Sequence, residues 1–161
     1  MSIQLKTLVL FTFVLGTLNG LSHAAVLTCD FSTGDATGSL RMSGYKVDNN
    51  PIYKGSFRLL VPNESYLEGA FRLSGNPDRA VLRLTHLSSS ADGAELKGRS
   101  PVTIRINGHV VVRDLDPGSH GYVTDELNVT KYLQDGENTL RIEYGNGTTH
   151  YWIKSLELNV Q

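Results

Sequence analysis

The sequence predicts an all-β protein built as a single antiparallel β-sandwich, and three observations carry this prediction. Short runs alternate between apolar and polar residues, as strands do when one of their faces is buried. Asn-Gly, Asp-Pro-Gly, Asp-Gly and Gly-Asn-Gly breaks separate these runs between residues 101 and 160. The chain has one cysteine and so no internal disulfide, which leaves a hydrophobic core to hold the fold together.

The first 24 residues have the pattern of a secretory signal peptide. Lys6 is basic, the run from Leu8 to Leu18 is apolar, and Ser22 and Ala24 are small residues at the two positions that signal peptidase reads. We therefore expect residues 1–24 to be removed and residues 25–161 to form one secreted or periplasmic domain. Because no other apolar run is long enough to cross a bilayer, we expect no transmembrane segment.

Cys29 has three interpretations. A free cysteine is commonly buried, and we favour a buried or partly buried thiol. A lipid anchor at Cys29 is disfavoured, because Thr28 precedes it where bacterial lipoprotein signals usually have Gly, Ala or Ser. An intermolecular disulfide remains the third interpretation.

The charge balance argues against a nucleic-acid partner. Lys and Arg number 15, and Asp and Glu number 16. The chain shows no basic patch with interleaved aromatic residues, which a nucleic-acid surface would need.

The alternation predicts the individual elements. After an irregular entry from Asp30, we expect strands around Leu40 and Met42 and then over residues 54–61, 66–73, 80–87, 102–106, 109–113, 139–144 and 151–160. Asn107-Gly108 predicts a two-residue hairpin turn. One short helical turn is expected near 128–134, overlapping the segment 125–133, with Asn128 as its cap.

Side-chain parity assigns the aromatic residues and the histidine of these strands. Trp152 shares its parity with Leu156 and Leu158 and is expected in the core, whereas Tyr151 has the opposite parity and is expected to offer a ligand platform. His86 is in register with Leu82 and Leu84, so we expect it half-buried at the sheet edge.

Several segments resemble the galactose-binding-domain-like jelly rolls, which include carbohydrate-binding modules and the sugar-binding domains of glycosidases and polysaccharide lyases. The matching segments are VTIRINGHVVV, LNVTKYLQDGENTLRIEY and YWIKSLEL, which cover somewhat over half of the chain after residue 24. The resemblance implies a jelly-roll fold and a secreted, non-catalytic module that binds a glycan or polysaccharide. It also implies a structural calcium ion in some members, for which the candidate oxygens here are those of Asp30, Asp35, Asp48, Asn49 and Asn50; no other cofactor is expected.

Strand direction locates the candidate binding site. If successive strands run up and down, the loops 88–100, 115–121 and 145–150 gather at one end of the sandwich. Sugars are held by aromatic rings together with charged and amide groups. The candidate ligand-binding residues at this end are Arg99, Asp116, His120, Tyr122, His150 and Tyr151.

Two other functions are considered. A protein-interaction or structural sandwich would dock a partner through an exposed sheet face, such as an apolar patch through Val110 and Val112. A small secreted hydrolase is the least favoured, because the sequence has no Gly-x-Ser-x-Gly, His-Glu-x-x-His or phosphate-binding loop. Glu126 and Glu143 could act as a glycosidase pair only across a cleft.

Overall fold

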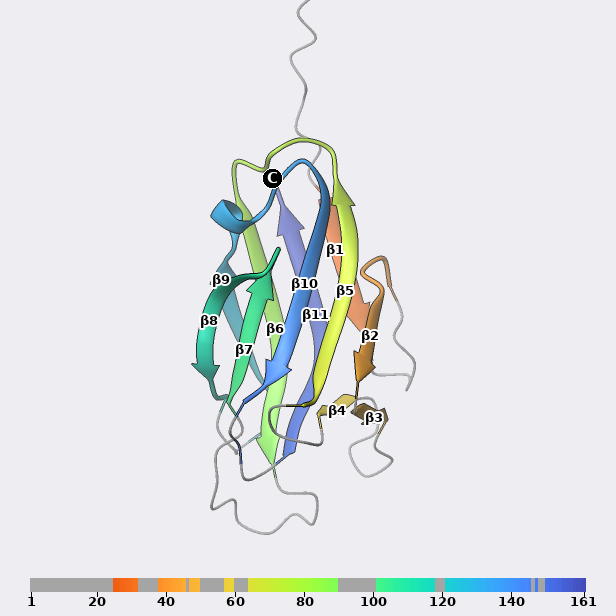
Figure 1. Ribbon diagram of the computed structural model, residues 1–161, viewed down its shortest axis with the longest axis vertical. Helices are drawn as coiled ribbons and strands as arrows, with labels where there is room; N and C mark the ends of the chain where they lie inside the picture. Colours follow the sequence, from red (N-terminus) through yellow and green to blue (C-terminus); the bar gives the residue numbers. More distant parts are fainter. Residues whose placement is uncertain are drawn as a thin grey trace, which may run out of the picture.

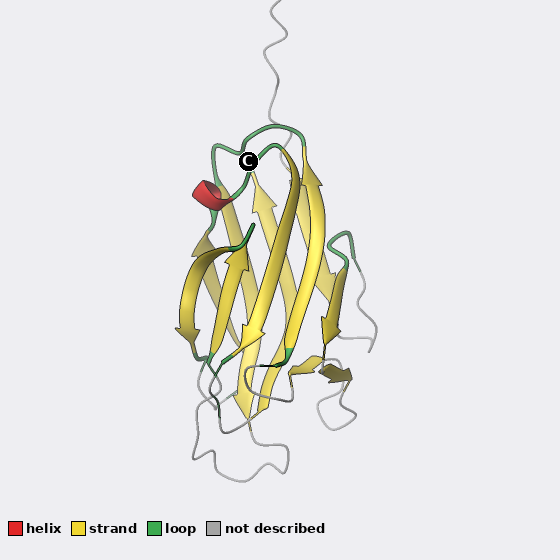
Figure 2. Ribbon diagram, in the orientation of Figure 1, coloured by secondary structure: helices red, strands yellow, loops and turns green. Residues whose placement is uncertain are grey.

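Two antiparallel sheets pack face to face in the computed structural model (Figures 1 and 2). The structure describes residues 25–31, 38–45, 47–49, 57–59, 64–89, 101–117, 121–145, 147 and 150–161. Within this part of the chain, sheet A has the strand order β3-β4-β11-β6-β9 with β1 also paired to β11, and sheet B has the order β2-β5-β10-β7-β8. The predicted antiparallel sandwich is therefore confirmed.

The element bounds agree with the alternation for most of the long strands, whereas the strands 47–49 and 123–128 were not predicted and the strand predicted over 54–61 is described only for 57–59. The strands are β1 (Ala25–Asp30), β2 (Met42–Tyr45), β3 (Val47–Asn49), β4 (Phe57–Leu59), β5 (Tyr66–Leu73), β6 (Ala80–Ser89), β7 (Val102–Ile106), β8 (His109–Leu115), β9 (Val123–Asn128), β10 (Gly136–Tyr144) and β11 (His150–Val160). One 3₁₀ turn, η1, spans Thr130–Tyr132. The predicted strands 66–73 and 102–106 have the bounds expected for them.

The core lies between the sheets and takes every second residue of the long strands. The residues that alternate along the core side of β5, β6, β7 and β10 are all buried: Leu67, Phe71, Leu73, Ala80, Leu82, Leu84, Val102, Ile104, Ile106, Leu140, Ile142 and Tyr144. Full burial of such apolar side chains stabilises the fold by roughly 1.5–3 kcal/mol each. The predicted alternation therefore holds on both sheets.

β1 was not predicted, because the expected entry was irregular from Asp30 and the first strand lay near Leu40. β1 pairs along its whole length with residues 155–160 of β11. Ala25, Leu27 and Cys29 lie on the core side of β1, but only Cys29 is fully buried and the apolar Val26 is exposed. The apolar residues of β1 therefore do not mark one face as the buried one. Residues 1–24, predicted to be a leader, lie outside the described residues.

The predicted helical turn is present but shorter than the segment expected to hold it. Asp125–Asn128 belongs to β9, which pairs with β6, and the turn begins only at Thr130. The Oδ1 atom of Asn128 accepts the backbone N–H of Thr130 at 3.1 Å, although Val129 is the N-cap residue. Asn128 thus orders the start of the turn from one residue before the cap.

A pair of hydrogen-bonded side-chain amides fixes the hairpin to the neighbouring turn. Asn107 and Gly108 have φ of 52° and 78°, which confirms the predicted hairpin turn. The Nδ2 group of Asn107 donates to Asn138 Oδ1 at 2.8 Å, and its Oδ1 accepts the N–H of Thr139 at 2.8 Å. Asn138 is 1% exposed and also bonds the backbone of Gln134. The two amides therefore join β7, β10 and the segment between η1 and β10.

Cys29 is a free, fully buried thiol within the core between the sheets. Burial raises its pKa to about 11, partly offset by a hydrogen bond with the backbone of Met42. The favoured interpretation, a buried thiol, is confirmed.

Cys29 is expected to react with a thiol reagent at neutral pH roughly a hundredfold more slowly in the folded protein than in the unfolded chain. The reactive thiolate is scarce at such a raised pKa, and the core blocks access. Because the chain has one cysteine, the labelling rate with and without urea measures this residue alone. Similar rates in both states would show that β1 opens readily from β11.

Candidate functional site

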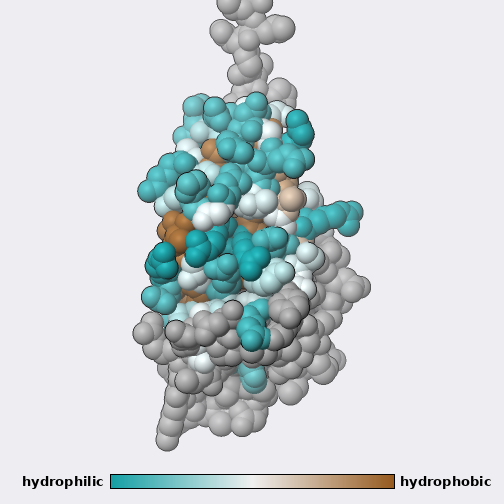
Figure 3. Space-filling view, viewed as in Figure 1, coloured by the Kyte–Doolittle hydropathy of each residue, from teal (hydrophilic) through white to brown (hydrophobic). Residues whose placement is uncertain are grey.

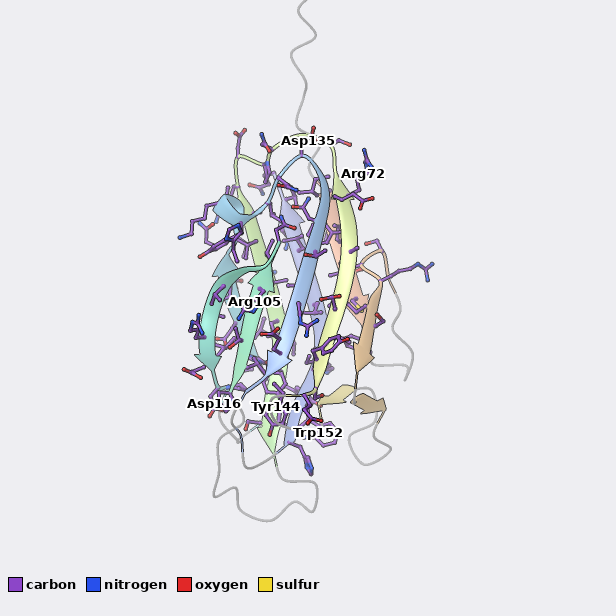
Figure 4. The ribbon with its side chains drawn as sticks, viewed as in Figure 1. Arg72, Arg105, Asp116, Asp135, Tyr144 and Trp152 are labelled. Carbon is purple, nitrogen blue, oxygen red and sulfur yellow. The ribbon has the colours of Figure 1, made fainter. Side chains whose placement is uncertain are left out.

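The strand ends that flank the three predicted loops lie at one end of the sandwich, as the strand directions predicted. β6, β8 and β10 run toward the lower end in Figure 1, and β7, β9 and β11 start from it. We call this the loop end. Asp116, Tyr144 and Trp152 lie toward it, whereas Arg72 and Asp135 lie at the opposite end (Figure 4).

The outer face of sheet A, turned away from the core, carries a buried apolar row near the loop end. Trp152 pairs with Leu87 across β11 and β6. Trp152 is 0% exposed and Leu87 4% exposed, yet neither belongs to the cluster between the sheets. The ring of His150 meets that of Trp152 edge-on, with centroids 6.3 Å apart. The burial predicted for Trp152 is thus confirmed, but the face predicted for it is wrong.

Tyr122 extends this row. It immediately precedes Val123, which pairs with His86, so it lies at the position next to Leu87. The Lys154 ammonium is 5.5 Å from the centroid of the Tyr122 ring. Because β6 lies between β9 and β11, this contact spans β6 on the outer face. Tyr122 is half-buried, which leaves part of its ring accessible.

A bulge in β11 explains why the parity prediction failed. The pairing of β11 with β6 shifts register between Ile153 and Ser155. Tyr151 and Ile153 face the core before the shift, and Leu156 faces it afterwards. One extra residue reverses which parity points inward. Tyr151 is therefore a correction: its ring is fully buried and offers no platform to a ligand.

Tyr151 instead belongs to a buried polar chain with His86 and Asp125. The Nδ1 atom of His86 is 2.5 Å from Tyr151 Oη, and its Nε2 atom is 2.8 Å from Asp125 Oδ2. A carboxylate can only accept, so Nε2–H donates to Asp125 and Nδ1 of the neutral ring accepts the phenol O–H. Both ring nitrogens of His86 and the phenol oxygen of Tyr151 are therefore hydrogen-bonded within this chain.

Burial sets the titration of these groups. It lowers the pKa of His86, an effect opposed by the hydrogen bond and charge of Asp125 and by the charge of Asp116. It raises the pKa of Tyr151 well above its ordinary value, and the charges of Asp125 and Asp116 add to this. The neutral form of both rings is therefore favoured at neutral pH.

His86 itself is a correction, since it was expected to be half-buried at a sheet edge. It is 0% exposed. β6 pairs with β9 on one side and with β11 on the other, so β6 is an interior strand. The inward ring of Tyr151 packs against the imidazole, with centroids 5.6 Å apart. The inward parity predicted for His86 was right.

The predicted site residues do not all converge. Tyr122 and His150 lie toward the outer face of sheet A, and Asp116 lies near the chain formed by His86 and Tyr151. Tyr151 is buried, and His120 and Arg99 lie outside the described residues. Lys154 was missed, because only the bulge brings it toward Tyr122.

The outer face of sheet B does not favour the docking alternative. It is mainly hydrophilic (Figure 3) and carries a chain of ion pairs, Glu68–Arg141–Glu143–Arg105, with contacts of 2.9–3.0 Å. Val110 and Val112 are half-buried, and Val112 packs against the core. The expected apolar patch is therefore not formed by these two residues.

The carboxylates considered for hydrolysis are separated. Glu126 pairs with Arg83 on the outer face of sheet A, whereas Glu143 pairs with Arg105 and Arg141 on sheet B. They lie on opposite faces of the sandwich and cannot flank one glycosidic bond.

The described residues contain no group of three or more His, Cys, Asp or Glu side chains that could hold a metal ion. Of the candidate calcium ligands, Asp30 is exposed at the end of β1, while Asp35, Asn50 and the side chains of Asp48 and Asn49 are not described. In the same part of the chain, no helix is long and apolar enough to cross a membrane.

Comparison with known proteins gives a likeness in structure alone. No protein-family model and no curated sequence matches the chain. The CBM36-1 domain of a multidomain xylanase from the hindgut metagenome of Trinervitermes trinervoides matches with a TM-score of 0.56 and 15% identity, over 84% of this chain and 96% of that chain. CBM35 from Paenibacillus barcinonensis matches with a TM-score of 0.56 and 17% identity, over 80% and 94%.

A carbohydrate-binding module CBM36 in complex with calcium and xylotriose also matches, with a TM-score of 0.56 and 12% identity, over 81% of this chain and 98% of that chain. At such identities the likeness establishes the fold alone. The predicted galactose-binding-like jelly roll, the fold of these carbohydrate-binding modules, is therefore the fold of this chain.

Proposed function

We propose that the protein is a secreted, non-catalytic carbohydrate-binding module that recognises a glycan at its loop end. The observation that carries the proposal is the accessible Tyr122 ring beside the Lys154 ammonium, on a fold shared with the CBM36 module in complex with calcium and xylotriose. A sugar presents an apolar ring face to an aromatic side chain and hydroxyl oxygens to a nearby donor. Tyr122 and Lys154 offer both groups side by side.

The other candidate contacts surround this pair. His150 lies against Trp152 on the same face, and Asp116 lies on the connection that leads to Tyr122. Arg99 and His120, which lie outside the described residues, stay in the proposed set as predictions from the sequence. Tyr151 is left out, because it supports the site from within the core.

Two further points support a binding role. Among the described residues at this end, the acid–base groups of Tyr151 and His86 are fully buried and so out of reach of a substrate. The neighbour in complex with calcium supports the prediction of a structural calcium ion, for which Asp30 is the described candidate ligand.

Tyr122→Ala is expected to weaken glycan binding by roughly ten- to a hundredfold, because it removes the stacking surface. Affinity electrophoresis against a polysaccharide panel would identify the ligand, and calorimetry would measure the affinity. Tyr122→Phe should retain most of it, since the ring remains.

Tyr132→Ala is the matched control. Tyr132 is also half-buried and has a lysine ammonium, that of Lys131, 4.9 Å from its ring centroid, but it lies in η1 at the opposite end. Its removal should leave the affinity unchanged in the folded protein. Equal affinities of wild type and Tyr122→Ala, or no binding to any glycan at millimolar concentration, would refute the proposal.

A further inference from the structure

A second polar surface lies on the outer face of sheet A, away from the loops. It is a shallow depression of about 270 Å³ over β6, β9 and β11. Its lining residues are Arg79, Val81, Arg83, Glu126, Glu157, Asn159 and Gln161. We call it the sheet A groove.

The charged side chains of the groove hold one another in place. Arg83 donates to Glu126 Oε1 from Nε at 2.8 Å, and its Nη2 lies 2.6 Å from the same oxygen. Asn159 Nδ2 donates to Glu157 Oε1 at 2.6 Å, and Arg83 Nη1 lies 3.7 Å from that oxygen. Arg83, Glu126 and Glu157 remain accessible, with side-chain exposures of 48%, 56% and 38%.

This arrangement leaves oriented groups open to a ligand. Both carboxylates use Oε1, so among the described residues Oε2 of Glu126 and of Glu157 has no partner. The amide oxygen of Asn159 also has none, and Arg83 Nη1 is too far from Glu157 for a hydrogen bond. The groove therefore offers both acceptors and donors, above the apolar side chain of Val81.

The charge balance selects the ligand class. Two arginines and two glutamates line the groove. Because the groove has no excess of either charge, it favours neither an anionic nor a cationic ligand. Hydroxyl groups both donate and accept. A neutral polyhydroxylated chain fits this mixture best.

The groove is continuous with Tyr122 along one face of the sheet. Thr85 and Thr124, whose hydroxyls are 2.9 Å apart, lie between the Tyr122 row and the row of Arg83 and Glu126. Outward side chains on a strand repeat every ~7 Å, so the groove begins about 13 Å from Tyr122. We infer that the sheet A groove binds the continuation of a neutral oligosaccharide whose end is held at Tyr122. This inference rests on the proposed function, since the same glycan occupies both surfaces.

Chain-length dependence of binding tests the inference. Wild-type protein should bind neutral xylo- or manno-hexaose at least about tenfold more tightly than the parent monosaccharide. Glu157→Ala and Asn159→Ala should each weaken hexaose binding by about tenfold, because each removes a hydrogen bond to a charged or fixed group. Both variants should bind the monosaccharide as the wild type does. The Asn159 side-chain amide signals should shift in NMR spectra when the hexaose is added but not when the monosaccharide is added.

Glu137→Ala is the matched control, because Glu137 is 83% exposed and pairs with Arg72 at 4.0 Å on sheet B. It should bind the hexaose as the wild type does. If Glu157→Ala and Asn159→Ala bind the hexaose as tightly as the wild type, the groove does not bind the glycan. If Tyr122→Ala still loses affinity in that case, the proposed function stands without the groove. If the two groove variants lose hexaose affinity and Tyr122→Ala does not, the groove stands and the loop-end site is overturned. A wild type that binds neither the hexaose nor the monosaccharide overturns both.

Discussion

Replacing Asn138 with Asp is expected to lower the free energy of unfolding by about 3–5 kcal/mol. Asn138 Nδ2 donates to the carbonyl oxygens of Gln134 and Gly136 at 2.8 and 3.0 Å, and the side chain is 1% exposed. A carboxylate has the same shape but no donor, so it would place a buried charge against two carbonyl oxygens. The loss should appear in urea unfolding followed by circular dichroism.

Asn128→Asp is the control for this substitution. The Oδ1 atom of Asn128 accepts the N–H and hydroxyl of Thr130, and Asp serves equally well in such a position. Its stability should stay within about 0.5 kcal/mol of wild type. A similarly small change in Asn138→Asp would mean that the amide pair does not hold the hairpin to the neighbouring turn.

The strands that the sequence predicted best have one strictly buried face. β5 and β7 kept the predicted bounds because each places every second side chain in the core. A one-residue shift would expose a whole row of such residues, so pattern and structure are tightly linked. β1 and the start of β9 lack this link, since their side chains are mostly exposed or half-buried, and neither was predicted.

The candidate site was harder to predict than the fold. Strand direction predicted which end of the sandwich holds the site. The side of the sheet on which Tyr151, Trp152 and Lys154 lie depends instead on one bulge. Nothing in the sequence around Lys154 marks an extra residue, because the run keeps an unbroken mixture of apolar and polar side chains. The buried partner of His86 was missed for the same reason, since Tyr151 was expected to point away from the core.

The buried histidine leads to the second large prediction, a loss of stability on mild acidification. Burial holds the pKa of folded His86 below the value of about 6.5 that a histidine has in an unfolded chain. The unfolded state therefore gains a proton first as the pH falls. The contribution of His86 is fully present above about pH 6.5 and is lost as the pH falls toward the lowered pKa, by up to about 1.4 kcal/mol per pH unit.

Urea unfolding between pH 7 and pH 5 measures this slope, and the window stays above the range where most carboxylates titrate. His86→Gln should remove the slope, whereas His109→Gln, at an exposed position beside the hairpin turn, should keep it. The His86 ring signals in NMR should titrate below pH 6.5. A ring that titrates above that value would instead mean that the carboxylates of Asp125 and Asp116 outweigh burial, and stability would then rise on acidification. The pH profile thus decides which of two opposed forces governs the buried chain beneath the proposed binding site.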